Sequence, residues 1–304
     1  MRFDGITFST KTGKMAHLEI ERLNPNILTA GSPKRMKMVA EFLEYAEVFE
    51  SGRGHIIVNG AYKGLKISAI STGMGPASAM IILPEIIEAA EGELLTILRL
   101  GTAGSLQPYV RGGHLHIPIS SIRDESSSQA VIGLEFPATA SPELIPIMIL
   151  ASEMHGYRLG ENLWIGPVHT KDNLYFKETP HFSPRREFLK QRLSSFREMG
   201  ALSSEMEFSA YCILRDYYEG KIDKRILTGC ILAIVNNFEE SEDRIKIGEV
   251  DVSKLEKDMI KIGLETFHLL DKLRNGEPIE LDKAILKMIS LRSRRDLLSE
   301  GQVD

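Results

Sequence analysis

The chain has 304 residues, of which 43% are hydrophobic and 26% charged, a composition ordinary for a soluble globular protein. Its net charge is −5, and Lys and Arg are scattered rather than gathered in a stripe, which argues against a nucleic-acid-binding protein and favours a small-molecule enzyme. No apolar run reaches the about 18 residues of a membrane span, and the N-terminus lacks the apolar middle of a signal peptide, so we expect a cytoplasmic protein without membrane contact.

The predicted elements alternate along the chain. Apolar β-type runs end in glycine turns and lead into segments of helical periodicity, a pattern that predicts an α/β domain. The expected strands span 26–30, 65–72, 94–100, 114–122 and 226–235. Helices are expected after the first two strands, the second kinked or delayed by Pro84, and again at 203–218 and 253–273.

A single domain over residues 1–274 is the simplest interpretation, because no repeat, low-complexity segment or linker interrupts them. Residues 275–304 begin with a turn-rich break and then become helical, so we treat them as a C-terminal helical extension of unknown role. Cys212 and Cys230 lie in apolar segments, which is typical of buried reduced thiols. His114 and His116 share a strand face, but no third ligand is near in sequence, and we predict no metal site.

Three of the predicted strands end in glycine-containing turns, at Gly31, Gly73 and Gly101. The backbone N–H groups of such turns suit an anion, especially where a helix begins. Arg35 follows the first turn, and Arg99 precedes the third; a guanidinium matches phosphate oxygens through paired hydrogen bonds. None of the turns matches GxxxxGK[ST] or GxGxxG, so an ATPase or a dinucleotide enzyme is not expected.

Four stretches together carry a family resemblance: GSPKR, STGMGPAS, LRLGTAGSLQP and SSEMEFSAY. Their order and spacing resemble the nucleoside phosphorylase-I family, most of all its uridine phosphorylase branch, from about His17 to Leu273. The resemblance implies a mixed, partly barrel-like central sheet flanked by helices, and dimers assembled into hexamers. It also implies reversible phosphorolysis, in which a nucleoside and phosphate give free base and ribose 1-phosphate without a cofactor.

Carried over position by position, the resemblance implies a phosphate site and a ribose site. The phosphate ligands would be Gly31, Arg35, Arg99, Thr102 and, from a neighbouring subunit, Arg53. Met206 would pack against the ribose, and Glu207 would accept hydrogen bonds from its 2′ and 3′ hydroxyls. His17 would reach the 5′ hydroxyl across a dimer interface. Arg99 would stand at a strand end because a phosphate dianion binds beyond it.

The base-binding stretch departs from the family pattern. Uridine phosphorylases have a Gln and an Arg two residues apart after a Phe-Tyr pair, whereas this chain has KDNLYFKETPHFSPRR, with Leu174 and Tyr175 at the aromatic pair. Substitutes for the missing polar pair would come from Lys177, Glu178, Arg185 or Arg186. Asn237 stands where purine-cleaving relatives have Asp and uridine enzymes have Arg, and an amide cannot act as a carboxylic acid.

Three functions stay open on this basis. The first is a nucleoside phosphorylase, with uridine the leading substrate and another pyrimidine or a purine nucleoside as alternatives. The second is a nucleosidase of the same fold that uses water, and the third is a non-catalytic nucleoside-binding homologue. Retention of the four arginine and threonine phosphate ligands favours the first. The expected partners are a nucleoside, phosphate and further copies of the chain, with no nucleic acid and no membrane.

Overall fold

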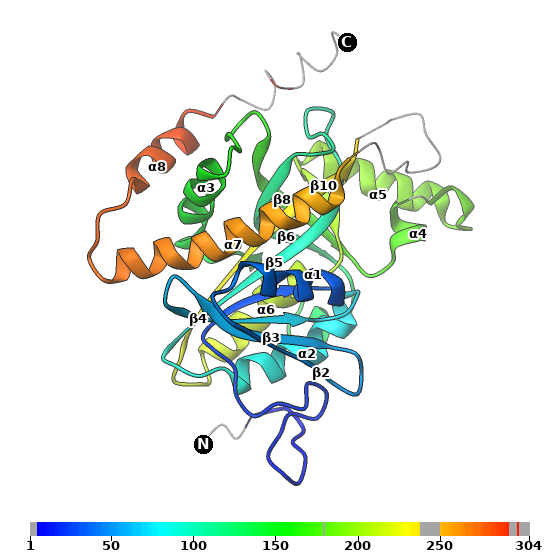
Figure 1. Ribbon diagram of the computed structural model, residues 1–304. Coiled ribbons are helices and arrows are strands. Elements are labelled where there is room, and N and C mark those ends of the chain that lie inside the picture. Colours follow the sequence, from blue (N-terminus) through cyan, green and yellow to red (C-terminus); the bar gives the residue numbers. More distant parts are fainter. Residues whose placement is uncertain (1–4, 179, 238–249, 292–296, 298–304) are drawn as a thin grey trace.

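One mixed sheet of ten strands runs through the computed structural model, which describes residues 5–178, 180–237, 250–291 and 297 (Figure 1). The strands are β1 (Asn26–Ala30), β2 (Ala46–Glu50), β3 (Ile56–Tyr62), β4 (Leu65–Ser71), β5 (Leu94–Ser105), β6 (Leu115–Asp124), β7 (Ala138–Thr139), β8 (Leu163–Lys171), β9 (Ser203–Glu205) and β10 (Arg225–Asn236). The predicted strands are all present, and the α/β class predicted from their alternation is confirmed.

Five of the strands close into a barrel. β10 pairs with β6 and with β5, β6 pairs with β8, β8 with β9, and β9 returns to β5. The other side of β5 continues through β1, β4, β3 and β2 as an open sheet. The expectation of a mixed, partly barrel-like central sheet is therefore confirmed. Because β5 belongs to both parts, its residues lie where barrel and open sheet meet.

Helices flank this sheet on both sides (Figure 1). They are α1 (Pro33–Val39), α2 (Pro76–Ala89), α3 (Leu144–Met154), α4 (Leu174–Glu178), α5 (Arg186–Glu198), α6 (Phe208–Glu219), α7 (Val252–Arg274) and α8 (Leu281–Ile289), with short 3-10 turns at 40–42, 128–130 and 180–182. α2 packs on α6, and α7 lies along β5 and β10 and contacts α1 and α3. The long amphipathic helix expected at 253–273 is confirmed as α7.

Three local expectations are wrong. GTAGS is not a turn, because β5 continues through it to Ser105, so Arg99 lies inside a strand. The helix α2 starts at Pro76 and continues past Pro84, so of the two effects expected of Pro84, a kink or a delay, the delay is wrong. The segment expected to be helical from 203 begins as strand β9, and its helix starts only at Phe208. Each of these differences alters which backbone N–H and C=O groups are free to bind a ligand.

Glycines 101 and 104 explain why the strand continues where the sequence indicated a turn. A Cβ on Gly101 would lie 2.7 Å from Cδ2 of Leu232 and 2.9 Å from Nη2 of Arg99. A Cβ on Gly104 would lie 2.5 Å from Oε1 of Glu178. Neither glycine has the positive φ that a turn would need. Neighbouring side chains therefore approach the strand so closely at these two positions that a residue with a Cβ would not fit.

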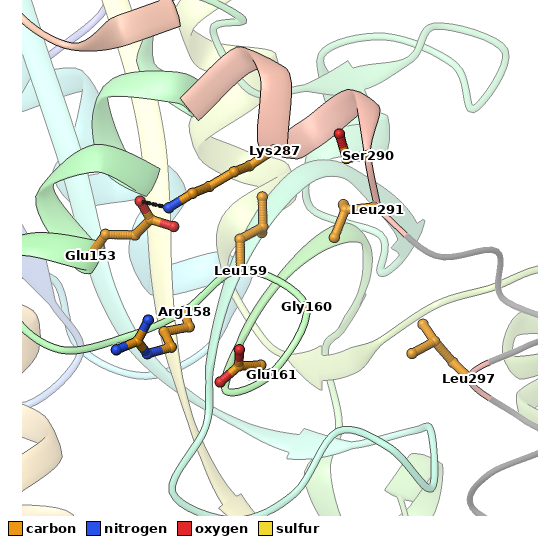
Figure 2. Close-up of a pocket in the computed structure, with 9 residues that line it drawn as sticks. All are labelled: Glu153, Arg158, Leu159, Gly160, Glu161, Lys287, Ser290, Leu291 and Leu297. Carbon is orange, nitrogen blue, oxygen red and sulfur yellow. Dashed lines mark hydrogen bonds and ion pairs between the residues drawn. The ribbon is translucent and has the colours of Figure 1, made fainter. Parts of the chain in front are cut away.

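The described part of the C-terminal extension packs on the body of the protein, whereas residues 292–296 and 298–304 lie outside the described residues. After α7 ends, α8 packs against α3, and Lys287 forms a 2.6 Å ion pair with Glu153. A pocket of about 300 Å³ opens between them, and Figure 2 shows its lining. The lining residues are Glu153, Arg158, Leu159, Gly160, Glu161, Lys287, Ser290, Leu291 and Leu297. In the described part of the chain, none of the helices has the length and apolar character that a membrane span needs.

Candidate functional site

Arg99 is buried on β5 between two carboxylates. Its Nε donates to Oε2 of Glu205 at 3.1 Å, and its Nη2 forms an ion pair with Glu207. Only 3% of Arg99 is exposed. Burial alone would lower the pKa of Arg99, but the charges of Glu207 and Glu205 outweigh it and raise that pKa. Arg99 therefore stays a cation, and its charge is balanced within the protein.

Glu205 and Glu207 have different tasks although they are two residues apart. Glu205 accepts the backbone N–H groups of Glu207 and Phe208 at 2.8 Å and 3.0 Å, so it caps the first turn of α6. Glu207 instead reaches the second glycine turn, where its Oε1 accepts the N–H of Gly75 at 2.6 Å. That N–H, expected to face an external anion, is thus bound by Glu207. Burial raises the pKa of the Glu207 carboxyl, and Arg99 opposes this shift.

Arg35 reaches the same strand from α1. Its Nη1 donates to the carbonyl oxygen of Leu100 at 2.8 Å, and its Nε and Nη2 both donate to Oε1 of Glu256, at 3.0 Å and 2.7 Å. Burial lowers the pKa of Arg35, while Glu256 on α7 counteracts this. Arg35 and Arg99 therefore converge on adjacent residues of β5. No motif in the sequence indicates Glu256, because its contact with Arg35 joins positions far apart in the chain.

The first two glycine turns lie against each other. A Cβ on Gly31 would be 2.8 Å from the carbonyl oxygen of Gly73, so only glycine fits there. Thr102 follows Arg99 on β5 and is half-buried, as is Met206 between β9 and α6. The predicted residues Gly31, Arg35, Arg99, Thr102, Met206 and Glu207 thus lie on elements that meet at β5.

Arg53 and His17 lie apart from this group within one chain. Arg53 is exposed on the loop between β2 and β3, and no ion pair joins it to another residue that the structure describes. Nδ1 of His17 lies 2.5 Å from Oε1 of Glu85 on α2, and the His17 backbone N–H donates to the same carboxylate at 3.0 Å. Their proposed contacts with substrate would have to cross to a neighbouring subunit.

The predicted base-binding residues divide into two groups. Leu174 and Tyr175 are exposed on α4, Tyr175 by 77%, and Asn237 is exposed, its Oδ1 accepting the N–H of Gly112 at 2.8 Å. Glu178 lies at the other end of α4, with its carboxylate close to the backbone of Gly104. Glu178 alone among these four therefore reaches the end of β5.

The other suggested substitutes for the missing base-binding pair have other contacts. Lys177 forms ion pairs with Asp172 at 2.8 Å and Asp124 at 3.3 Å. Arg185 lies over the ring of Phe188, and Arg186 pairs with the neighbouring Glu187 at 3.3 Å. Both arginines are exposed on or next to α5.

Two further residues lie at the Gly104 end of β5 that were not predicted from the sequence. Asn236, not Asn237, is buried beside Gly104, and its Oδ1 accepts the N–H of Ser105 at 3.3 Å. Lys171, at the end of β8, is only 1% exposed; its Nζ lies 2.6 Å from Oε2 of Glu178 and donates to Oγ of Ser204 at 2.6 Å. A lysine as the last residue of a largely buried strand is the feature of the sequence that indicates it.

Seven charged side chains form three ion-paired groups along β5. The cations are Arg35, Arg99 and Lys171, and the carboxylates are Glu178, Glu205, Glu207 and Glu256. When all are ionised, negative charges outnumber positive ones by one. A dianion bound among them would require further positive charge or a proton.

The two histidines of HLH, His114 and His116, have different hydrogen-bond partners. Nδ1 of His114 accepts from Nε1 of Trp164 at 3.0 Å, whereas His116 is fully buried, with Ser203 Oγ at 2.8 Å and the Gly166 carbonyl oxygen at 3.1 Å. Burial lowers the pKa of His116 to about 4, so it is neutral. No group of three metal-ligating side chains is found among the residues that the structure describes. Cys212 and Cys230 are buried free thiols, as predicted.

The fold is a closed barrel joined to an open sheet, and the buried Arg35 and Arg99 meet at β5. These features define an α/β protein with a buried charged site at the strand shared by barrel and sheet. Residues 25–255 match the model of the phosphorylase superfamily, and the chain belongs to that family. It is 27% identical over 232 residues to a uridine phosphorylase of Treponema pallidum, a match covering 76% of this chain and 85% of that protein.

Similarity extends to purine-cleaving members and to solved structures. The chain is 30% identical over 207 residues to a DeoD-type purine nucleoside phosphorylase of Geobacillus kaustophilus, covering 67% of this chain and 77% of that protein. The crystal structure of a uridine phosphorylase from Vibrio fischeri superposes with a TM-score of 0.67 at 22% identity, covering 85% of this chain and 98% of that one. The fold expected from the resemblance is thereby confirmed.

Proposed function

We propose that the protein catalyses reversible phosphorolysis of a nucleoside, with uridine as the leading substrate, phosphate as co-substrate and no cofactor. The observation that carries the proposal is the convergence of Arg35 and Arg99 on β5 beside Glu207. Relatives named for uridine and for purine nucleoside cleavage support the same reaction class.

In this proposal the phosphate binds beside Gly31, Arg35, Arg99 and Thr102, and a partner subunit adds Arg53. The negative balance of the site supports the last assignment, because an exposed arginine would supply the charge that a dianion needs. Met206 packs against the ribose, Glu207 binds its 2′ and 3′ hydroxyls, and His17 of a partner reaches the 5′ hydroxyl. The active unit is accordingly a homo-oligomer of at least two chains.

The reaction proceeds at the anomeric carbon of the ribose. The bond to the base breaks, its electron pair leaves with the base, and positive charge develops on the sugar as in glycoside cleavage. Phosphate forms the new C–O bond from the opposite face and also balances that charge. Two arginines fixed by Leu100, Glu205 and Glu256 hold it in line, and such positioning lowers the barrier by several kcal/mol.

The test is base release from uridine, thymidine, cytidine, inosine and adenosine, each with and without phosphate. Phosphate-dependent release from at least one nucleoside is expected. Release that is equally fast without phosphate would identify a nucleosidase instead. Binding without any release, detected as ligand-dependent thermal stabilisation, would identify a non-catalytic homologue.

A further inference from the structure

Lys171 and Glu178 form a buried ion pair in which Glu178 is a predicted base-binding residue and Lys171 has no assigned role. Lys171 Nζ lies 2.6 Å from Glu178 Oε2, and the lysine is 1% exposed, so its charge is stabilised by neighbouring groups and not by water. An ammonium has three N–H donors. One of them is donated to Ser204, and no other hydrogen bond of the ammonium is found among the residues that the structure describes. The contact with Glu178 is an ion pair, and Oε2 of Glu178 is buried without a hydrogen-bond donor.

The pair lies at the opposite end of the site from the two arginines. The guanidinium of Arg99 is beside Gly101, whereas Glu178 is beside Gly104. Three residues of a strand span roughly 10 Å, so β5 separates the two ends by about the reach of a nucleoside. Gly104 pairs with Ser204 on β9 and with Asn236 on β10, which brings Lys171 and its partners to the same end.

Glu207 lies between the two ends. It binds Arg99 directly, and Lys171 is close enough to lower the pKa of its carboxyl. Phosphate and leaving base occupy opposite faces of the ribose during the reaction. If phosphate binds at the arginines and ribose at Glu207, the base is directed toward Lys171 and Glu178.

A directed chain of hydrogen bonds holds the ammonium in place. Lys171 donates to Ser204 Oγ, which lies 3.0 Å from Nδ1 of His169, and Nε2 of His169 lies 3.1 Å from Oδ2 of Asp124. Burial lowers the pKa of His169, so it is neutral, and its Nε2–H donates a hydrogen bond to the carboxylate of Asp124. Nδ1 is then an acceptor for the Ser204 hydroxyl, whose oxygen is free to accept from Lys171.

We propose that Lys171 donates a hydrogen bond to a carbonyl of the leaving base and that Glu178 accepts the neighbouring ring N–H. This inference rests on the proposed function. Uracil, thymine and 6-oxopurines present such an N–H beside a C=O, whereas cytosine and adenine present an amino group beside an unprotonated nitrogen. With the latter bases, donor would meet donor and acceptor would meet acceptor.

The same contact assists bond cleavage. As the C–N bond breaks, its electron pair moves onto the base, and the carbonyl oxygen gains negative charge. Lys171 keeps its proton and stabilises that charge through a stronger hydrogen bond, and the released base anion takes a proton from water afterwards. Removing one such donor from a buried site lowers the rate by about 10²–10³-fold.

The experiment compares the wild type, Lys171→Met and Lys190→Met, an exposed α5 lysine that serves as control. With saturating phosphate, the wild type is expected to cleave uridine and inosine at least about 10²-fold faster in kcat/KM than cytidine and adenosine. Lys171→Met is expected to lose about 10²–10³-fold on uridine, and Lys190→Met to match the wild type. The loss for Lys171→Met should be smaller with 5-fluorouridine, because fluorine stabilises the departing anion without the lysine.

Three outcomes would overturn the inference while leaving phosphorolysis in place. They are equal cleavage of cytidine and uridine by the wild type, near-wild-type uridine cleavage by Lys171→Met, and equal losses on uridine and 5-fluorouridine, which would mean a structural role. The phosphate-induced rise in Tm shows whether Lys171→Met is folded. If Lys171→Met is not folded, Glu178→Gln is tested in its place, because its amide can donate a hydrogen bond as well as accept one. The ratio of kcat/KM for uridine to kcat/KM for cytidine must then be smaller in Glu178→Gln than in the wild type. An unchanged ratio overturns the inference. No base release by the wild type from any nucleoside would overturn the proposed function as well.

Discussion

The guanidinium of Arg99 on β5 binds the carboxylate of Glu207 at the start of α6, and both side chains are buried. The residue proposed to bind phosphate is thus joined to the residue proposed to bind ribose. The position of Arg99, the proposed phosphate ligand, therefore depends on the position of Glu207, the proposed ribose ligand. In the proposed function this contact couples phosphate binding to nucleoside binding, and it leads to the first prediction.

Arg99→Lys should weaken phosphate use strongly. Lysine keeps the charge but cannot form paired hydrogen bonds with two partners. We expect kcat/KM for phosphate to fall by about 10²–10³-fold, with a smaller change in the KM for nucleoside. Arg215→Lys is a matched control, because Arg215 is also buried and pairs with Asp216 at 2.7 Å on α6. Equal loss for both substrates would remove Arg99 from the phosphate site.

Glu256 positions Arg35 from α7 and has no proposed contact with substrate. Glu256→Gln keeps one acceptor but removes the charge that fixes the guanidinium. The KM for phosphate should rise by roughly 3–10-fold, while the KM for nucleoside changes by less than about 2-fold. Glu41→Gln, which removes an exposed partner of Lys257, should change neither. Unchanged phosphate kinetics in Glu256→Gln would show that Arg35 needs no such support.

Sharing of sites between subunits predicts complementation. Arg53→Ala and Glu207→Ala should each be nearly inactive alone. In a mixed dimer, one site combines an intact Glu207 with a partner's intact Arg53, so random mixing restores roughly a quarter of the sites. Activity is measured after the two variants are unfolded and refolded together, with separately refolded variants as the control. No recovery, although mixed dimers form, would place Arg53 outside the site.

His116 should make the protein sensitive to mild acid. Burial lowers its folded-state pKa to about 4, below that of the unfolded chain. The unfolded state therefore takes up a proton first, and stability present above pH 6.5 is lost as the pH falls toward 4. His116→Gln should reduce that loss by roughly 1–3 kcal/mol, measured as the free energy of unfolding in urea at pH 7 and pH 4.5. Identical pH dependence in both proteins would contradict this assignment.

The strands and the long helix were predictable because their apolar periodicity is local. The end of β5 was not, since Gly101 and Gly104 resemble turn residues in the sequence but leave room for Arg99, Leu232 and Glu178. Leu232 and Glu178 lie far from positions 101 and 104 in the chain, so the local sequence does not indicate that they approach these glycines. The predicted turn is wrong because contacts with distant parts of the chain determine the backbone conformation at this position.

The same reason explains which site residues were missed. Glu256 meets Arg35 across most of the chain length, and Lys171 acquires its significance only when β8 and β9 lie side by side. Asn236 and Asn237 are adjacent and chemically identical, so only the strand register decides that Asn236 is buried. Phosphate and ribose positions follow compact motifs, whereas the base end is assembled from separate strands.

The stoichiometry of ribose 1-phosphate to free base, followed by phosphorus NMR during uridine cleavage, tests the central claim most directly. Phosphorolysis at the arginines of β5 predicts one ribose 1-phosphate for each uracil released. Release of uracil with the phosphate signal unchanged would contradict it, because water would then be the nucleophile.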